Sequence, residues 1–550
     1  MSFTFTSSAA DWGRIAPELV LAAFALLMLM VDLTLPQPGK DKQPGNFIVL
    51  PVLGLLGVVG ALIASIILFN IGDYQTAFNN MVGSDAGSLY AYFIILSASS
   101  LGIALSPAYL KRLKLIHQGE YYALMLLGTL GMMIMAAATS FLTIFLGLEM
   151  LSLALYILCG FARRGASQES GMKYFLLSSF ASAILLYGIA LIYGATGNTS
   201  FAGIHTFIAA HTNATLLLLI GMGLLIVGFA FKVSAVPFQA WTPDVYDGAP
   251  APVTAFMSVG TKAAALIAFA RVFDIVLGPL ANQWLPVVWA IAVLTIVGGN
   301  ILALAQSNLK RLLAYSSIAH AGYLLIGVVA GGTVGIAAIL FYLFCYSFLN
   351  LGAFGIVSVL ERADNSGSSL TDLRGLWYRQ PLLAGLLAFF LLALAGFPPM
   401  AGFAAKYYIF YAALQSSHPE LLIIGVLASV LGMYYYLRFI AAMFMERQPA
   451  AQAATTTASA PGPTPVSGRR VSAKLSNGGA ATAVAVKATT SPLVKDKAAA
   501  PMEEPRAVIG WTTWLALGVS VAGTLLMGTL LAYWLVELAQ YAAGVMMRVM

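Results

Sequence analysis

Four lysines and one glutamate lie within or beside apolar segments that are long enough to cross a membrane. The lysines are Lys173, Lys232, Lys262 and Lys406, and the glutamate is Glu149. A charge at the centre of a membrane helix costs roughly 2.5–3.5 kcal/mol, so five of them cost about 12–18 kcal/mol together. Ionisable groups kept at such a cost typically form an ion or proton path, or pair with one another. The residue types therefore indicate proton or ion transfer first, with a structural network of ion pairs as the alternative.

The composition is that of a membrane protein. Hydrophobic residues make up 60% and charged residues 9% of the 550 residues, whereas a soluble domain has about 25% charged residues. Most Lys and Arg residues lie in short loops beside apolar runs, which indicates membrane topology rather than nucleic-acid binding. Cys159 and Cys345 lie in separate apolar runs, so we expect neither a disulfide nor a metal site. The sequence contains no CxxC pair, Walker loop or dinucleotide fingerprint, so we expect no cofactor in this chain.

About fourteen transmembrane helices are predicted, because a bilayer core needs about 20 apolar residues per helix. The apolar runs cover residues 16–35, 47–71, 88–106, 121–137, 139–161, 170–194, 214–235, 253–277, 284–304, 310–330, 334–360, 381–414, 420–445 and 509–540. The first run is too long for a signal peptide and lacks a cleavage site, so we interpret it as a retained helix. The expected fold class is an all-α polytopic membrane protein.

Two of the predicted helices contain interruptions. Pro237 follows Lys232, and the pair Pro398 and Pro399 precedes Lys406. Proline removes a backbone donor and breaks a helix, and irregular backbone is tolerated at membrane depth only where protein or water covers it. Paired interruptions are typical of transporters built from inverted repeats. We therefore predict two inverted five-helix repeats, each containing a broken helix.

Lys and Arg are distributed unequally between the two sides of the membrane. An even number of spans puts both termini on one side, and the odd-numbered loops then carry most of the basic residues. The positive-inside rule places these loops in the cytoplasm and both termini outside. Arg271 is assigned to a loop on the outer side in this scheme, and Lys310 to a cytoplasmic loop.

The chain is expected to have five parts. They are a three-helix segment (1–120), two antiporter-like repeats (121–280 and 281–447), a linker (448–507) and a C-terminal transmembrane helix (508–550). The linker is rich in Ala, Thr, Pro, Ser and Gly, so we interpret it as disordered and cytoplasmic. It is either a tolerated insertion or a segment that binds lipid headgroups or a partner subunit.

Five motifs resemble one family of membrane proteins. They are Gly147-Leu148-Glu149, the block from Phe231 and Lys232 through Trp241 to Val253, the pair Thr261-Lys262, the run from Asn308 to Tyr323, and Gly396 to Gly402 with Phe403 and Lys406. Over residues 120–447 the sequence is similar to the antiporter-like membrane subunits of proton-pumping NADH:quinone oxidoreductase, respiratory complex I. Tyr246 and Ala249 within the long block favour the subunit N branch of that family.

The resemblance implies roles for five residues. These are a switching ion pair between Glu149 and Lys173, the lysine of the broken seventh helix at Lys232, a connecting lysine at Lys262 and an exit-side lysine at Lys406. From its place on the tenth predicted span, between the two expected half-channels, we also predict a relay at His320. A neighbouring carboxylate favours the charged form of a lysine and burial disfavours it, so movement of the pair would load or release a proton at Lys232. A histidine can carry a proton near neutral pH, and a purely structural His320 is the alternative.

Three polar residues near the first interruption receive simpler interpretations. Many relatives have a histidine where this chain has Gln239, and an amide cannot change charge, so the resemblance gives this position no proton role. Asp244 and Asp247 follow the proline break, and we interpret them as residues that stabilise a turn, with an aqueous ion entry as the alternative.

The resemblance also implies a function, partners and a location. The chain would be a proton-translocating membrane subunit of complex I in the inner (plasma) membrane of a bacterium, and an enzyme only as part of that assembly. NADH, FMN, iron–sulfur clusters and quinone would be held by partner subunits. The partners would be a neighbouring antiporter-like subunit, small membrane subunits and lipid, without nucleic acid. A subunit of an Mrp-type monovalent cation/proton antiporter and a structural membrane-arm subunit are the two alternatives.

Overall fold

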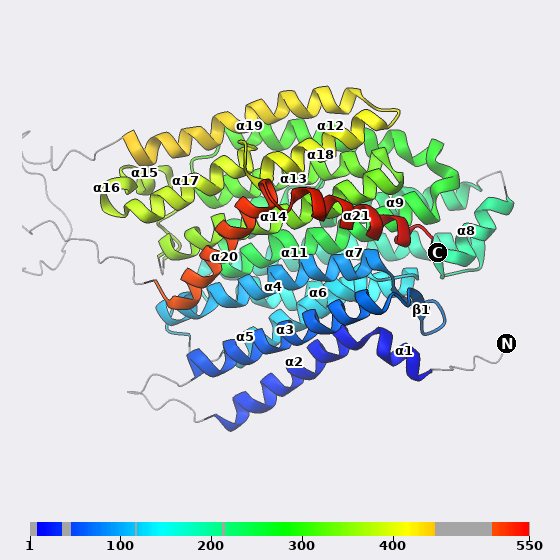
Figure 1. Ribbon diagram of the computed structural model, residues 1–550, viewed down its shortest axis with the longest axis horizontal. Helices are drawn as coiled ribbons and strands as arrows, with labels where there is room; N and C mark the ends of the chain where they lie inside the picture. The colour runs from blue at the N-terminus through cyan, green and yellow to red at the C-terminus, as the bar shows by residue number, and fades with distance from the viewer. Residues whose placement is uncertain are drawn as a thin grey trace, which may run out of the picture. The chain divides into compact units, whose positions relative to one another are not determined.

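Helices make up nearly all of the regular structure in the computed structural model (Figure 1). It describes residues 8–35, 46–115, 118–211, 215–362, 364–445 and 509–548, and the predicted linker, 448–507, lies outside them. The strands found in this part of the chain are β1 (Gln75–Ala77) and β2 (Val82–Ser84), a short antiparallel hairpin that the sequence did not predict. The described helices belong to one compact unit.

Thirteen of the described helices are long and apolar enough to cross a membrane. They are α2 (Ala16–Thr34), α3 (Asn46–Ile71), α4 (Ala86–Arg112), α5 (Gly119–Ala136), α6 (Phe141–Gly160), α7 (Gly165–Thr196), α9 (Leu216–Val233), α11 (Ala251–Ala270), α12 (Ala281–Leu304), α13 (Leu309–Ala330), α14 (Gly332–Leu360), α19 (Glu420–Met445) and α20 (Trp511–Gly528). Each coincides with a predicted span. The class of an all-helical, multi-pass membrane protein is therefore confirmed, whereas the inverted relation of two repeats stays a prediction.

The remaining predicted span, 381–414, is present as two helices of 15 residues each, α17 (Pro381–Ala395) and α18 (Ala401–Gln415). The last predicted span is also divided, because α20 ends at Gly528 and α21 (Ala532–Met546) follows. Gly528 lies so close to the carbonyl of Pro399 that any side chain there would overlap it. α20 therefore packs against the interruption between α17 and α18.

The shorter elements connect the long helices or extend them. They are α1 (Ala9–Arg14), α8 (Phe201–Ala210), α10 (Trp241–Gly248), α15 (Leu370–Leu373), α16 (Leu376–Arg379), the π-helical turn Arg271–Val276 at the end of α11, and the 3₁₀ turn Gly278–Leu280. α10 is the second half of the first interrupted helix.

The centre of the helical unit is formed by α11, α13 and α14. α11 is buried along its whole length, and α13 and α14 are buried along most of theirs. Figure 1 shows α11 and α14 in the middle of the bundle, with α2 and α19 at opposite edges. A helix that is apolar on all sides and buried belongs in a bundle centre, so polar groups on α11 and α13 are enclosed by protein.

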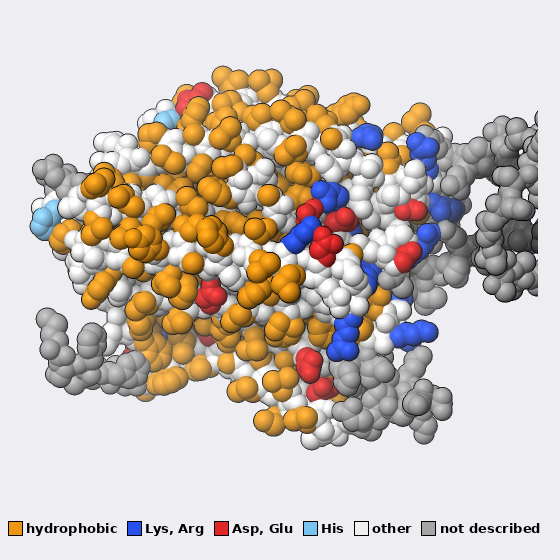
Figure 2. Space-filling model, turned by 180° about the vertical axis from the view of Figure 1, so that it is seen from behind, with side chains coloured by type: hydrophobic (Ala, Val, Ile, Leu, Met, Phe, Trp, Pro, Cys, Tyr) orange, Lys and Arg blue, Asp and Glu red, His pale blue; other side chains and the backbone are white. Residues whose placement is uncertain are grey.

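The outer faces are apolar over wide areas. Phe180, Leu216 and Val430 are examples of large hydrophobic side chains that are more than half exposed. Figure 2 shows such side chains spread over one face, with Lys and Arg gathered toward one end of it. This is the surface expected of helices that contact lipid. Which end faces the cytoplasm stays a prediction.

Candidate functional site

Lys232 lies at the C-terminal end of α9, where the helix is interrupted. The next residue but one, Ser234, adopts the left-handed conformation with a φ of 66°. The ammonium group of Lys232 donates hydrogen bonds to Oγ of Ser152 (2.7 Å) and to the hydroxyl of Tyr174 (3.4 Å). It also lies 5.5 Å from the centre of the Tyr174 ring. A cation at this place is favoured by the negative end of the helix dipole and by the ring face.

Neighbouring side chains satisfy the backbone groups that the first interruption frees. Nε1 of Trp241 donates to the carbonyl of Phe231 (3.1 Å). The backbone N–H of Val236 donates to Oγ1 of Thr295 on α12 (2.9 Å). The predicted break is therefore confirmed, and it is enclosed by protein as membrane depth requires.

Lys406 follows the second interruption, after Gly396 with its φ of 92°. Its ammonium group donates to the carbonyl of Ala395, the last residue of α17 (2.9 Å), and to Oγ of Ser429 on α19 (2.8 Å). It lies 5.3 Å from the centre of the Tyr323 ring. Lys406 thus caps a carbonyl that the ended helix leaves free, and it opposes the dipole of α17.

Lys262 lies in the middle of α11 and contacts α13. Its ammonium group donates to the carbonyl of Ser317 (2.5 Å) and to the hydroxyl of the same residue. The side chains of Lys232, Lys262 and Lys406 are only 2%, 1% and 7% exposed. Three of the four predicted lysines are therefore buried, and each of the three contacts a serine hydroxyl.

His320 follows Ser317 by one turn of α13 and is buried. Its Nδ1 lies 2.7 Å from the hydroxyl of Tyr342, and its ring centre lies 5.0 Å from that of Tyr346. The imidazole interacts electrostatically with both Lys262 and Lys406. His320 is thus a buried group that both lysines influence, and its service as a relay stays a prediction.

Two sets of hydrogen-bonded polar side chains, one beside the Ser317 partner of Lys262 and one that ends at the Tyr323 ring beside Lys406, were missed by the sequence analysis. Ser316, next to Ser317, hydrogen-bonds to the hydroxyl of Tyr436, and Tyr435 donates to Oδ1 of Asn300 (3.2 Å). Nδ2 of Asn300 donates to the hydroxyl of Tyr323 (3.3 Å), whose ring faces Lys406. Single polar residues in apolar helices form no sequence motif. Their contacts with one another appear only when α12, α13 and α19 pack together.

Glu149 and Lys173 are not paired in this structure. Nζ of Lys173 lies 2.7 Å from Oε1 of Glu169 and 3.0 Å from Oδ2 of Asp244, and the side chain is 42% exposed. Lys173 is only the ninth residue of α7, so its long side chain reaches solvent and these two carboxylates. The predicted contact with Glu149 is absent, and only the separated arrangement of the expected pair is seen.

Glu149 instead interacts electrostatically with Lys232. Its Oε1 is buried and accepts no hydrogen bond from a described residue. An unpaired buried carboxylate oxygen is costly. The favourable interaction of Glu149 is therefore the electrostatic one with the ammonium group of Lys232, and this oxygen receives no hydrogen bond from a neighbouring donor among the described residues.

Asp244 does more than stabilise a turn, which corrects our interpretation of it. Its two oxygens pair with Lys173 on α7 and with Nη1 of Arg311 on α13 (2.8 Å). Asp247 accepts a hydrogen bond from Nδ2 of Asn308 (3.1 Å). These contacts fix α10 between α7 and α13.

Two buried ion pairs involve residues that the sequence analysis had assigned to loops. Nη2 of Arg271 lies 2.8 Å from Oδ2 of Asp85, with both side chains buried. Nζ of Lys310 lies 3.5 Å from Oε2 of Glu361, also buried, and Arg164 pairs with the same carboxylate. The loop assignments of Arg271 and Lys310 are wrong, because Arg271 begins the π-helical turn that continues α11 and Lys310 lies in the first turn of α13. Their ion pairs join helices and lie apart from the lysine row.

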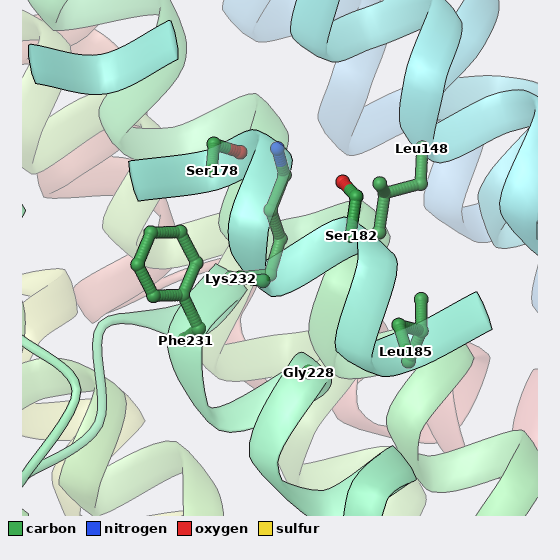
Figure 3. A pocket seen from close by; sticks show the side chains of 8 residues that line it. Leu148, Ser178, Ser182, Leu185, Gly228, Phe231 and Lys232 are labelled. Carbon is green, nitrogen blue, oxygen red and sulfur yellow. The ribbon is translucent and has the colours of Figure 1, made fainter. Parts of the chain in front are cut away.

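A small cavity adjoins the ammonium group of Lys232 (Figure 3). It is lined by Leu148, Ser178, Ala181, Ser182, Leu185, Gly228, Phe231 and Lys232. The cavity volume is about 10 Å³, which is close to the volume that one water molecule needs. Figure 3 shows the amino group of Lys232 directed between the hydroxyls of Ser178 and Ser182. One water held by these hydroxyls would contact the lysine.

Comparison with known proteins identifies the family. The family model described as NADH:quinone oxidoreductase/Mrp antiporter, TM, matches residues 138–432. NADH-quinone oxidoreductase subunit N of Trichlorobacter lovleyi is 43% identical over 434 residues, which cover 78% of this chain and 87% of the relative. Subunit N of Chloroflexus aggregans is 43% identical over 441 residues, covering 79% and 88%. The chain belongs to the subunit N family. The matched region contains all six predicted site residues.

Solved structures agree with the family assignment. A chain from respiratory complex I of Thermus thermophilus with bound aureothin aligns with a TM-score of 0.70 and 30% identity, covering 95% of this chain and 99% of that one. A chain from the Mrp complex of Dietzia sp. aligns with a TM-score of 0.74 at 20% identity, covering 98% and 97%. The second likeness shows a shared fold alone.

Proposed function

We propose that this subunit N family member carries protons through the membrane as part of a proton-pumping NADH:quinone oxidoreductase. The observation that carries the proposal is the row of buried lysines, Lys232, Lys262 and Lys406, each bonded to a serine hydroxyl within an apolar bundle. A buried lysine changes its charge readily because burial disfavours the ammonium form and a nearby carboxylate favours it. Such a group can accept and release protons without a cofactor of its own.

The geometry supports a sequence of proton transfers. Water in the small cavity would bring a proton to Lys232, where the negative charge of Glu149 stabilises it. The proton would pass to Lys262, and then to Lys406 through His320 or the hydroxyl and amide chain that ends at Tyr323. Redox chemistry with NADH, FMN, iron–sulfur clusters and quinone would take place in partner subunits.

The same proposal includes the surroundings of the chain. It would assemble with a neighbouring antiporter-like subunit and with small membrane subunits in a bacterial plasma membrane. Its contribution to the reaction of the complex would be proton translocation only. Both termini would lie outside, with the segment 448–507 in the cytoplasm. This orientation rests on the positive-inside rule.

Replacing Lys232 tests the proposed function. In the assembled complex, Lys232→Met should abolish most proton pumping and reduce quinone reduction with it, because no group at the break then accepts a proton. Lys232→Arg should fail as well, since arginine does not release its proton in proteins. Lys111→Met is the matched control, because Lys111 is exposed at the end of α4.

Pumping is measured in sealed vesicles with a pH-sensitive dye, and assembly is checked by co-purification of the other subunits. Wild-type pumping by an assembled Lys232→Met complex would exclude the proposed path. Sodium-dependent exchange without NADH would instead favour the antiporter alternative.

A further inference from the structure

Tyr246 is a buried residue of α10 that the proposed lysine row does not use. Its hydroxyl forms no hydrogen bond with a described residue, although the side chain is completely buried. The ring is held edge to face by Trp241 and by Phe354, with centroid distances of 6.4 Å and 6.1 Å. A buried unpaired hydroxyl costs about 1–3 kcal/mol, and the position of Tyr246 near both lysine sites distinguishes it from other buried tyrosines of this kind.

The helix that carries Tyr246 lies between the two lysine sites. α10 packs against α7, which carries the Tyr174 hydroxyl bonded to Lys232, and against α13, which carries the Ser317 hydroxyl bonded to Lys262. Asp244 fixes α10 in this place through its ion pairs with both helices. One short helix therefore contacts both helices whose hydroxyls bond the two lysines.

The Tyr246 hydroxyl interacts with groups on both sides. On the Lys232 side it interacts electrostatically with Tyr174 and with the thiol of Cys159. On the Lys262 side it interacts with the side chain of Ser317 and with Tyr346, the ring next to His320. The hydroxyl thus interacts with groups beside both lysines.

We propose that the hydroxyl of Tyr246 relays protons between Lys232 and Lys262, an inference that rests on the proposed function. The Lys232 ammonium group gives up one proton. This proton reaches the Tyr246 oxygen by way of the Tyr174 hydroxyl or of a transiently bound water molecule. The Tyr246 oxygen accepts it and releases its own proton toward Ser317 and the neutral amine of Lys262. Lys232 ends as the amine, Lys262 ends as the ammonium ion, and Tyr246 is unchanged.

Removing the hydroxyl and keeping the ring tests the relay in the intact complex. Tyr246→Phe should lower proton pumping, and the quinone reduction coupled to it, by about tenfold or more, since a lost proton-transfer group typically costs 10²–10⁴-fold. The solvent deuterium isotope effect on turnover should rise, because proton transfer becomes the slow step. Assembly should be unchanged.

Tyr122→Phe is the matched control. Tyr122, on α5, is also completely buried, and its hydroxyl also has no hydrogen-bond partner among the described residues. It contacts Tyr121 with its ring and has no bond to a lysine of the row. The control should pump like the wild type and show an unchanged isotope effect.

Three results decide the matter. Wild-type pumping by an assembled Tyr246→Phe complex overturns the relay, and it leaves the proposed function standing if Lys232→Met loses pumping in the same assay. An equal loss in Tyr246→Phe and Tyr122→Phe also overturns it, because both would then report packing. If Tyr246→Phe does not assemble, 3-fluorotyrosine at position 246 keeps the shape with a more acidic hydroxyl, and an unshifted pH profile of pumping overturns the relay.

Discussion

The buried pair of Arg271 and Asp85 should behave as a structural unit whose single loss is worse than its double loss. Nη2 of Arg271 lies 2.8–2.9 Å from both carboxylate oxygens of Asp85, and it also donates to Oγ of Ser88 (2.7 Å). Its Nε donates to the carbonyl of Ala136 (3.0 Å). The pair joins α4, which belongs to the predicted N-terminal segment, to the end of α11.

The expected loss of stability follows from the burial of the ion pair. Both side chains are at most 1% exposed, so solvent does not screen either charge. Removing one partner of a buried pair costs about 3–5 kcal/mol, because the other charge stays unpaired. Arg271→Met leaves Asp85 with its bonds to Ser88 and no cation. A loss of this size lowers the folded-to-unfolded ratio by about two to three and a half powers of ten.

The assay is the thermal stability of the purified assembled complex, followed by loss of the subunit from the assembly on heating. Arg271→Met and Asp85→Asn should each lower the midpoint clearly, and the double variant should be more stable than Arg271→Met. Proton pumping per NADH oxidised should stay normal in whatever fraction remains assembled. If the double variant is destabilised, relative to the wild type, by the sum of the two single effects, the two residues act independently and the argument from burial is wrong.

Two other predictions concern the lysine row. Glu149→Gln should weaken pumping more than Glu149→Asp, because only the aspartate keeps the negative charge that faces Lys232; equal pumping by Glu149→Gln and the wild type would make the glutamate structural. Lys406→Met should both lose pumping and destabilise the complex by about 1–3 kcal/mol, because the carbonyl of Ala395 loses its donor. Dye quenching in vesicles measures pumping, and a melting curve measures stability. Loss of pumping with unchanged stability would contradict the capping role.

The spans and the breaks were predictable because their causes are local. Runs of about 20 apolar residues predict membrane helices, and Pro237 and Pro399 mark the interruptions that Ser234 and Gly396 turn into left-handed backbone. The burial of Lys232 followed from the length of its apolar run.

The partners of the charged residues were not predictable, since they come from helices far apart in the sequence. Lys173 pairs with Asp244, which is 71 residues away in the sequence, and Arg271 pairs with Asp85, which is 186 residues away. Tyr435, Asn300 and Tyr323 join a polar chain only through the packing of α12, α13 and α19. A single sequence predicts which residues are costly to bury, and the assembled helices decide which of them meet.

The two interruptions are enclosed in different ways, and this bears on how the chain is made. The first is covered by Trp241 and by Thr295 of α12, which follow it closely in the sequence. The second is covered by α20, whose Gly528 lies against Pro399 and is synthesised about 130 residues later. The partners that cover the first break are therefore present once α12 has been made, whereas the second break gains the cover of α20 only when the C-terminal helices follow. The second half of the chain is thus completed by its C-terminal helices.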